Sequence, residues 1–311
     1  MAKAYLRPFV LAFCLLSFFG LVQAATNTNK PLTIVLDWFV NPDHAPLFVA
    51  KQQGFFKKHG IRVKIIPPAD ASDGPKLVAA GKADLALNYQ NQSIMQINNG
   101  LPLIRVATLI NQPLDTIAVL KSSNIHSIDD LKGKTIGYST TGFEAVTIKT
   151  MLAKHHLTTK DVKLVNVNYN LIQSLITHRV DATIGMMRTI EPIQMALQGY
   201  PARLFYPEDN GVPHYAELIF EANKKNINDP RLPAFIKALQ EGVAYLKEHP
   251  KKTWHVFAKN HPELNNELNY KSWLATYPYF DDHPNHYSLH QYQVLLNYMK
   301  KHKLMKKNIT R

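Results

Sequence analysis

The sequence predicts a two-lobed α/β protein in which each lobe is a mixed, mainly parallel sheet flanked by helices, with a two-strand hinge between the lobes. Short apolar, β-branched runs alternate with helical patterns along most of the 311 residues, as expected for strands joined by crossover helices. This alternation occurs twice with a similar order of elements. Hydrophobic residues make up 46% and charged residues 19%, which excludes a disordered or collagen-like chain.

The first block begins with the run Leu32–Leu36, which is typical of a strand buried on both faces. A helical pattern follows from residue 44 to residue 58, and Gly60 is its expected stop. Ser72 is suited to cap the next helix and Gly81 to end it. Further strands are expected at residues 62–66, 84–88, 104–109 and 116–120, and further helices at 72–80 and 90–99.

The second block repeats this order after residue 121. Strands are expected at residues 134–138, 162–167 and 180–184, and helices at 127–131, 142–155, 169–177 and 190–198. The phrase at residues 81–86, which leads from a helix into a strand through Asp84, has a counterpart at residues 178–183 with Asp181. A strand at 214–220 and helices at 232–248, 251–259 and 288–304 complete the chain.

Two chain crossings, near residues 116–120 and 212–220, are expected to join the lobes. The first lobe is therefore predicted to be discontinuous, with residues 31–116 and 217–311 and the C-terminal helices. The second lobe is predicted to contain residues 117–216.

The first 24 residues have the pattern of a signal peptide. Lys3 and Arg7 precede an apolar run from Pro8 to Val22, and Ala24 ends a small-residue cleavage pattern. A spanning helix needs about 20 apolar residues, so the run is short for an anchor, although an uncleaved anchor is the alternative. We therefore expect an exported protein that does not span the membrane after cleavage.

Charge and motifs limit the chemistry further. The single cysteine, Cys14, lies in the predicted signal peptide, so a disulfide scaffold and a cysteine-ligated metal are excluded. The net charge of +13 indicates an anionic neighbour, but an exported chain without a known nucleic-acid module is not expected to bind nucleic acid. His283, His286 and His290 lack a further ligand pattern, and no catalytic motif is present. No catalytic residue, metal or cofactor is predicted.

A ligand site is expected beyond the carboxyl ends of the parallel strands, where such sheets bind their ligands. The candidate residues there are Asp37, Trp38, His44, Asn88, Tyr89, Thr141, Gly142, Phe143, Met187 and Glu191.

Their chemistry suits a planar, nitrogen-bearing ring. Trp38, Tyr89 and Phe143 have rings that can sandwich it. Asp37 and Glu191 have carboxylates that can accept hydrogen bonds from an amino group and a ring nitrogen. Backbone N–H groups at the helix start near Gly142 can bind a carbonyl or an anion.

These residues also have ordinary structural interpretations. Trp38 can be packing between the lobes, and Asp37 can be a helix cap. Tyr89 can lie on the rim without stacking on a ligand, and the turn at residues 140–142 can simply cap its helix.

Several segments resemble a known family. They are residues 36–44 (LDWFVNPDH), 47–51 (LFVAK), 54–60 (GFFKKHG), 77–84 (LVAAGKAD), 131–138 (LKGKTIGY) and 180–182 (VDA). The chain resembles the thiamine-pyrimidine-precursor family of substrate-binding proteins, which is related to those for nitrate, sulfonates and taurine. The resemblance implies a type II periplasmic-binding-protein fold and a periplasmic location. It also implies a 4-aminopyrimidine ligand, such as a hydroxymethyl or formylaminomethyl derivative, that is delivered to an ABC-transporter permease.

The same family has a cytosolic enzyme branch, which makes the pyrimidine from a protein-bound pyridoxal phosphate with a histidine and a cysteine-rich loop. This chain departs from that branch, since Asn88 stands where its lysine is expected and Gln92 where its histidine is expected. The chain is therefore not predicted to be an enzyme. Within the binding branch, Met186–Arg188 replaces the usual segment rich in tyrosine or tryptophan.

A different ligand class is the alternative. A binding protein for a sulfonate, nitrate or another small anion would need a cation in the cleft, and Arg188 is the only candidate that the sequence offers.

Overall fold

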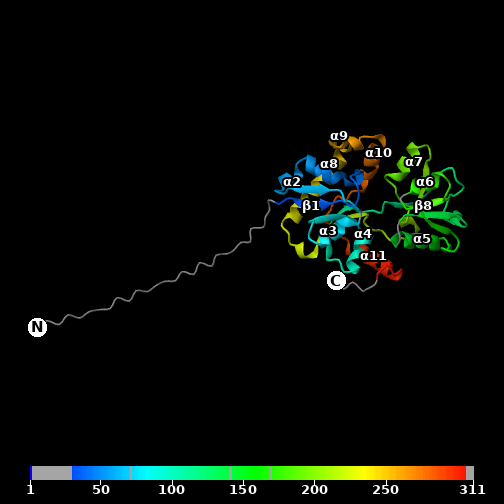
Figure 1. Cartoon of the computed structure of the whole chain (residues 1–311), viewed down its shortest axis with the longest axis horizontal. Helices are drawn as coiled ribbons and strands as arrows, with labels where there is room; N and C mark the ends of the chain where they lie inside the picture. The colour runs from blue at the N-terminus through cyan, green and yellow to red at the C-terminus, as the bar shows by residue number, and fades with distance from the viewer. Residues whose placement is uncertain (2–29, 71, 140–141, 169, 306–311) are drawn as a thin grey trace.

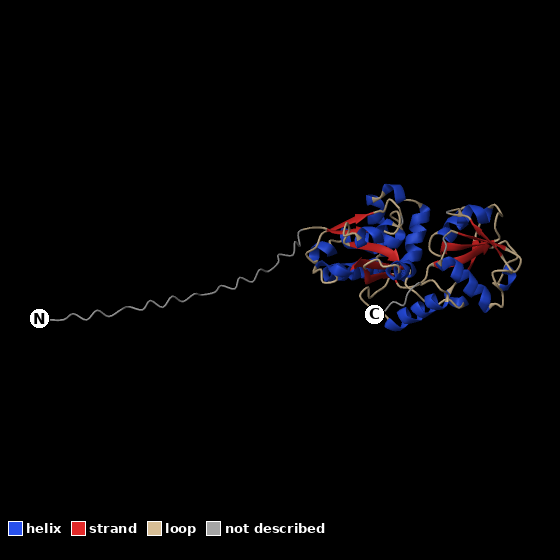
Figure 2. Ribbon diagram, turned by 60° about the horizontal axis from the view of Figure 1, so that its bottom comes forward, coloured by secondary structure: helices blue, strands red, loops and turns tan. Residues whose placement is uncertain are grey.

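The computed structural model describes residues 1, 30–70, 72–139, 142–168 and 170–305. The predicted signal peptide therefore lies outside the described residues, apart from Met1. Two sheets stand side by side, and each is covered by helices (Figures 1 and 2). This arrangement confirms the predicted two-lobed α/β class.

The first sheet is formed mainly by the N-terminal part of the chain. It contains, in order, β2 (Val63–Ile66), β1 (Leu32–Val35), β3 (Leu85–Tyr89), β10 (Leu218–Asn223) and β4 (Leu103–Ile110). Strand β1 pairs in parallel with β2 and β3, whereas β10 is antiparallel to β3 and β4. Its helices are α1 (Ala45–Gln52), α2 (Phe55–Lys58), α3 (Asp73–Ala79), α4 (Gln90–Asn98), α8 (Arg231–Glu248), α9 (Pro250–Asn260) and α10 (Glu267–Thr276).

The second sheet has the same plan. Its order is β7 (Lys163–Asn166), β6 (Thr135–Tyr138), β8 (Ala182–Met187), β5 (Asp115–Leu120) and β9 (Ala202–Phe205). Strand β5 is antiparallel to β8 and β9. The remaining helices are α5 (Phe143–Lys154), α6 (Leu171–Ile176), α7 (Glu191–Leu197) and α11 (Leu289–Lys301). Each sheet thus receives one antiparallel strand next to its parallel core, and these two strands lie where the chain changes lobe.

The elements differ from the predicted ones at four places in particular. The helix expected at 44–58 is divided into α1 and α2, because Gly54 adopts a left-handed φ of +76° that interrupts the helix. Strand β9 and helix α10 were not predicted as separate elements. The strand expected at 214–220 begins at Leu218, because the preceding residues form the connection between the lobes.

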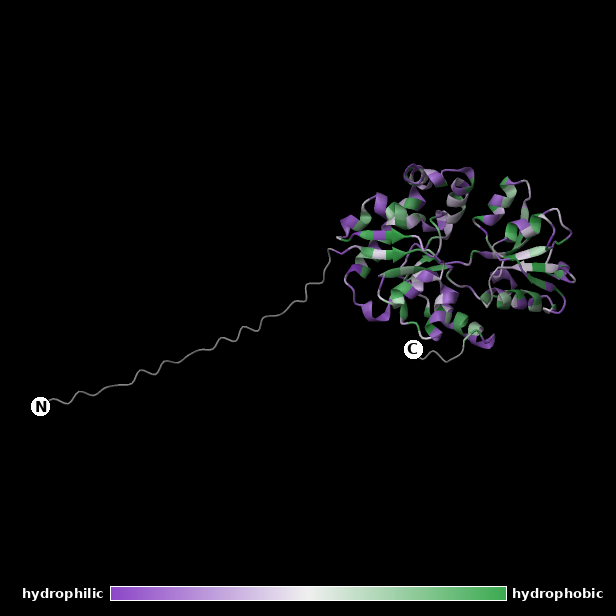
Figure 3. Ribbon diagram, viewed as in Figure 1, coloured by the Kyte–Doolittle hydropathy of each residue, from purple (hydrophilic) through white to green (hydrophobic). Residues whose placement is uncertain are grey.

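The strands form the apolar interior of each lobe (Figure 3). In the first lobe Phe220, Phe235 and Trp273 are almost completely buried, so the aromatic side chains near the C-terminus are core packing. Helix α11 belongs to a segment predicted for the first lobe, yet its Leu295 and Met299 pack in the cluster of the second lobe. The exact lobe boundaries remain a prediction.

The two lobes share one detail at the start of their central strands. The Asp84 carboxylate accepts the Thr33 N–H at 2.8 Å, and the Asp84 N–H donates to the Thr33 carbonyl at 3.1 Å. Asp181 makes the same two bonds with Thr135, both at 2.8 Å. The similar phrases at residues 81–86 and 178–183 therefore have one structural role, which is to join two parallel strands at their amino ends.

Helix α8 approaches α1 closely at Gly242. A Cβ atom added there would lie 2.7 Å from the Pro46 carbonyl oxygen and 2.9 Å from the Ala50 Cβ. We expect Gly242→Ala to lower the free energy of unfolding by about 1–3 kcal/mol, since the helices would have to separate. Urea denaturation would measure the change. Ala244→Ser, on the exposed side of α8, is the control, and equal stabilities of the two variants would contradict the packing argument.

Candidate ligand-binding site

The candidate site lies between the lobes, where the carboxyl ends of the parallel strands meet the amino ends of β5 and β10. Helix α7 of the second lobe packs against α10 of the first, so the two lobes are in contact beside the candidate site (Figure 1). The side chains at the candidate site are mainly acidic and aromatic. Hydrogen bonds from neighbouring loops and helix ends hold most of them in place.

Asp37 and His44 form a buried pair beyond β1. His44 Nε2 lies 2.9 Å from Asp37 Oδ1, and His44 Nδ1 accepts the Asn41 N–H at 3.2 Å. Since Nδ1 is the acceptor, the proton is on Nε2, which donates to the carboxylate. His44 has no exposed surface, so it orients Asp37 and is not available for direct ligand contact.

Asp43 is a second buried acid in the same loop. It is in the short 3₁₀ helix Pro42–His44, whose capping residue Asn41 accepts the Asp43 N–H at 2.8 Å. Its carboxylate accepts a hydrogen bond from the Thr276 hydroxyl of α10 at 3.1 Å. Burial raises its pKa from 3.8 to about 6, His44 lowers it and the nearby Asp37 raises it.

Two further acids lie where the chain passes between the lobes. Glu217 directly precedes β10, and its carboxylate accepts the Leu114 N–H at 2.6 Å. Burial raises the pKa of Glu217 from 4.5 to about 7. Asp115, the first residue of β5, accepts the Gly185 N–H at 2.9 Å. Burial and the neighbouring charges of Glu144 and Glu217 raise the pKa of Asp115 well above its ordinary range.

The second lobe contributes Glu191 and Met187 to the cleft. Glu191 is the first residue of α7, and its carboxylate accepts the Met187 N–H at 2.8 Å. Burial is the main cause that raises the pKa of Glu191 from 4.5 to about 7, backbone N–H groups lower it, and the charge of Asp43 contributes to the rise. The charge of Asp43 in the first lobe thus acts on Glu191 in the second. Met187 packs against the core of the first lobe.

The one arginine predicted as an anion ligand is already paired. Arg188 forms two hydrogen bonds to the Glu208 carboxylate, at 2.7 and 3.1 Å. Its guanidinium also lies over the Tyr206 ring, 4.2 Å from the ring centre, and contacts the Asp115 carbonyl at 3.3 Å. This geometry neutralises the guanidinium charge, because the Glu208 carboxylate binds two of its N–H groups.

Two of the three predicted rings can reach a ligand. Trp38 has 39% of its surface exposed and meets Phe39 edge to face at 5.8 Å. Tyr89 is half-buried, and burial and the charges of Asp37 and Glu217 raise the pKa of its hydroxyl well above 10. Phe143 belongs to the apolar core of the second lobe, where its ring packs against those of Tyr215 and Tyr298. The expected sandwich of three rings is therefore reduced to Trp38 and Tyr89.

Asn88 does not face the cleft, which corrects its predicted role. Its side-chain amide donates to Gln96 at 2.9 Å and to Glu221 at 3.0 Å, and its carbonyl accepts the Tyr89 N–H. Asn88 is also almost completely buried, and its amide is occupied by partners on α4 and β10.

The expected anion-binding turn is only partly described. Thr141 lies outside the described residues. Gly142 precedes α5 with a φ of +90°, a conformation that favours glycine.

Asp115 and Glu217 were missed by the sequence analysis. Asp115 is the first residue of the antiparallel strand β5 and Glu217 directly precedes β10, whereas the predicted site residues follow parallel strands. An acid at the start of an apolar strand at each lobe crossing is the signal that could have found them.

Among the described residues, no group of three or more His, Cys, Asp or Glu side chains is arranged to hold a metal ion. Within the same residues, no helix combines the length and apolar character needed to cross a bilayer.

Comparison with known proteins identifies relatives over most of the chain. The family model described as "NMT1/THI5 like" matches residues 41–253. A Haemophilus influenzae protein named "Putative thiamine biosynthesis protein" is 46% identical over 280 residues, which cover 90% of this chain and 89% of that protein. The formylaminopyrimidine-binding protein of Halalkalibacterium halodurans is 30% identical, with 84% of this chain and 81% of that protein covered.

An enzyme is also among the relatives. The 4-amino-5-hydroxymethyl-2-methylpyrimidine phosphate synthase THI11 of Saccharomyces cerevisiae is 29% identical, with 82% of this chain and 78% of that protein covered. These relatives confirm the predicted family resemblance.

Solved structures show the same fold. The alkanesulfonate-binding protein SsuA from Xanthomonas axonopodis superposes with a TM-score of 0.68 at 17% identity, covering 89% of this chain and 94% of that chain. This likeness confirms the periplasmic-binding-protein fold, and at such low identity it shows the fold alone.

The buried acids make stability depend on pH. The folded protein holds the Glu217 proton up to about pH 7, whereas an ordinary glutamate releases it near pH 4.5. The folded state thus binds more protons in this interval, so the free energy of unfolding falls as pH rises from 4.5 to 7. Glu217→Gln should weaken this fall and raise stability at pH 8 by up to about 3 kcal/mol. Urea denaturation between pH 5 and 8 would measure it.

The matched control is Glu267→Gln, because Glu267 is exposed on α10 and forms a surface pair with Lys271 at 2.9 Å. This variant should keep the wild-type pH slope. A Glu217→Gln protein with an unchanged slope would show that Glu217 is ionised at neutral pH and would contradict the assignment.

Proposed function

The chain belongs to the NMT1/THI5-like family, and from this membership we propose that it is a periplasmic solute-binding protein that captures a 4-aminopyrimidine precursor of thiamine for an ABC transporter. The observation that carries the proposal is the acidic character of the cleft. Asp37 and Asp43 of the first lobe and Glu191 of the second are buried acids that follow strands of the two sheets, the charge of Asp43 acts on Glu191, and Arg188 is held by Glu208.

The charge of the cleft favours a hydrogen-bond donor over an anion. A carboxylate facing an aminopyrimidine can accept one hydrogen bond from the amino group and one from a protonated ring nitrogen. The same carboxylates would repel a sulfonate or nitrate. The raised pKa values of Asp43 and Glu191 show that burial opposes their ionised forms, so a cationic ligand would relieve this cost.

Each lobe has a defined role in this proposal. In the first lobe, His44 fixes the orientation of Asp37, and Trp38 offers a half-exposed face for stacking. In the second lobe, Glu191 at the start of α7 faces the same cleft. A ligand that contacts both lobes stabilises their closed arrangement by its differential affinity, and a permease would recognise that arrangement.

A binding role is favoured over the synthase activity named for some relatives. Asn88 has an amide where the enzyme branch is expected to have a lysine, and an amide cannot form a Schiff base with pyridoxal phosphate. Asn88 is also engaged with Gln96 and Glu221. None of the cleft residues described above is a lysine.

A ligand panel tests the substrate class. The melting temperature should rise with 4-amino-5-hydroxymethyl-2-methylpyrimidine or its formylaminomethyl counterpart, because a ligand that binds only the folded state stabilises it by RT ln(1 + [L]/Kd). Taurine and nitrate should give no shift. The reverse pattern would assign the cleft to a small anion. An absorbance band of a lysine-linked cofactor after incubation with pyridoxal phosphate would instead favour the synthase.

Two variants test the proposed contacts by titration calorimetry with the pyrimidine that binds. Trp38→Ala should weaken binding about tenfold, since ring stacking contributes about 0.5–1.5 kcal/mol in addition to buried area. Asp37→Asn keeps the acceptor for His44 but loses the charge, and should weaken binding by about 1.5–3 kcal/mol.

The matched control for Trp38→Ala is Tyr200→Ala, which removes a similarly exposed ring of the second lobe after α7. Its affinity should equal that of the wild type. Unchanged affinity in both Trp38→Ala and Asp37→Asn would place the ligand elsewhere.

A further inference from the structure

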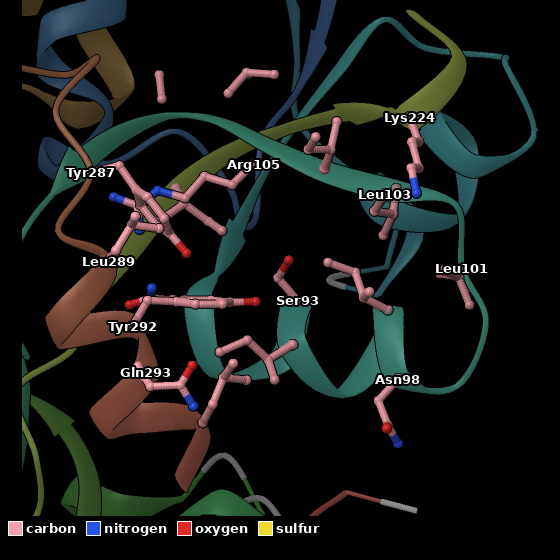
Figure 4. A pocket seen from close by; sticks show the side chains of 18 of the residues that line it. Ser93, Asn98, Leu101, Leu103, Arg105, Lys224, Tyr287, Leu289, Tyr292 and Gln293 are labelled. Carbon is pink, nitrogen blue, oxygen red and sulfur yellow. The ribbon is translucent and has the colours of Figure 1, made fainter. Parts of the chain in front are cut away.

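A separate cavity of about 850 Å³ lies beside the first lobe, between α4, β4 and the segment at residues 284–300 (Figure 4). The candidate residues between the lobes do not line this cavity. Its volume is in the range of small-molecule sites, about 300–1,000 Å³. Its rim includes the exposed residues Pro102, Lys224 and Leu289, so the cavity reaches the surface.

Most of the cavity wall is apolar. The apolar side chains come from α4, from β4 with the turn before it, and from α11, and they include Ile94, Ile97, Leu101, Leu103, Val106 and Leu296. Such a wall favours a hydrocarbon or ring surface in the cavity, because burying apolar area removes it from water.

A cation, Arg105 of β4, lies at one end of this apolar wall. Its guanidinium is 4.7 Å from the centre of the Tyr287 ring, and it donates a hydrogen bond to the Thr108 hydroxyl. Burial lowers the pKa of Arg105, while the nearby Tyr287 and Asp281 raise it. Within the described part of the chain, Arg105 forms no ion pair.

The acid nearest to Arg105 in the sheet is not its partner. Glu221 lies opposite Arg105 in the β10–β4 register, but its carboxylate accepts hydrogen bonds from Ser93 at 2.6 Å and Asn88 at 3.0 Å. Lys224 and Lys300 add two more positive charges at the rim, and neither forms an ion pair among the described residues. The charge of Asp281 acts on Arg105, but no carboxylate of the described residues lies within ion-pair distance of its guanidinium. An anionic group beside this largely buried cation would therefore be favourable.

We propose that this cavity is a second ligand site, which binds a small amphipathic carboxylate. The carboxylate would pair with Arg105, which offers a planar fork of donors, and the apolar tail would lie along α4 and α11. Tyr292 extends across the cavity toward Ser93 and forms part of the surface under the tail (Figure 4). The assignment does not depend on the ligand of the interlobe cleft.

Titration calorimetry of the purified protein with three eight-carbon probes tests the site. Octanoate should bind with one molecule per chain, 1-octanol at least tenfold more weakly, and octyltrimethylammonium not at all. This order separates recognition of the carboxylate from simple burial of the tail. Equal affinities for the three probes, or no binding of octanoate, would overturn the proposal.

Variants locate the octanoate. Arg105→Gln should weaken its binding at least tenfold, and Ile97→Trp, which fills the cavity and leaves the charge in place, should abolish it. Arg179→Gln removes an exposed arginine of the second lobe with the same change in net charge and should have no effect.

Circular dichroism would check that each variant is folded. If Arg105→Gln does not fold, Ile97→Trp still tests the site. Wild-type octanoate affinity in folded Ile97→Trp would overturn the proposal. Loss of octanoate binding in Trp38→Ala with full binding in Arg105→Gln would also overturn it, by placing the probe in the interlobe cleft.

Discussion

Burial of carboxyl groups between the lobes is the constraint on which the site depends. Asp43 and Glu217 are each less than 5% exposed, and burial raises the pKa values of both. A carboxylate removed from water is unfavourable unless donors or a cation face it. Here the Leu114 N–H donates to Glu217 and the Thr276 hydroxyl donates to Asp43, while the His44 ring does the same for the neighbouring Asp37. In the proposed function, a ligand rich in hydrogen-bond donors would supply the remaining partners.

The fold explains how so many acids reach one place. Each sheet receives its antiparallel strand from the connection between the lobes, so Asp115 begins β5 and Glu217 precedes β10 at the same junction. The carboxyl ends of the parallel strands meet them there with Asp37 and Glu191. Because the two lobes share one plan, down to the matching bonds of Asp84 and Asp181, the same edge of each sheet is turned toward the cleft.

The sequence predicted the class and the order of most elements, because those follow from apolar periodicity. Its placement of the ligand site at the carboxyl ends of the parallel strands stays a prediction. The sequence could not predict which way a side chain points when every side of its element is buried. Asn88 in strand β3 bonds to Glu221 of the neighbouring strand, and Phe143 at the start of helix α5 packs in the second core. Their residue types suit a ligand site, and only the three-dimensional packing shows that they are not part of it.

A shared fold leaves the ligand class open, because function depends on the groups that line a site and not on the architecture around it. The SsuA structure named as an alkanesulfonate-binding protein has this fold at 17% identity. An anion site needs cations or free donors at the cleft, whereas here Arg188 has Glu208 and the Tyr206 ring as partners. To bind an anion, the chain would have to break that pair and keep Asp43 and Glu191 protonated, which their pKa values of about 6 and about 7 do not favour above neutral pH. A cationic or amine-bearing ring requires neither condition, so the electrostatics of these residues support the proposed aminopyrimidine over an anion.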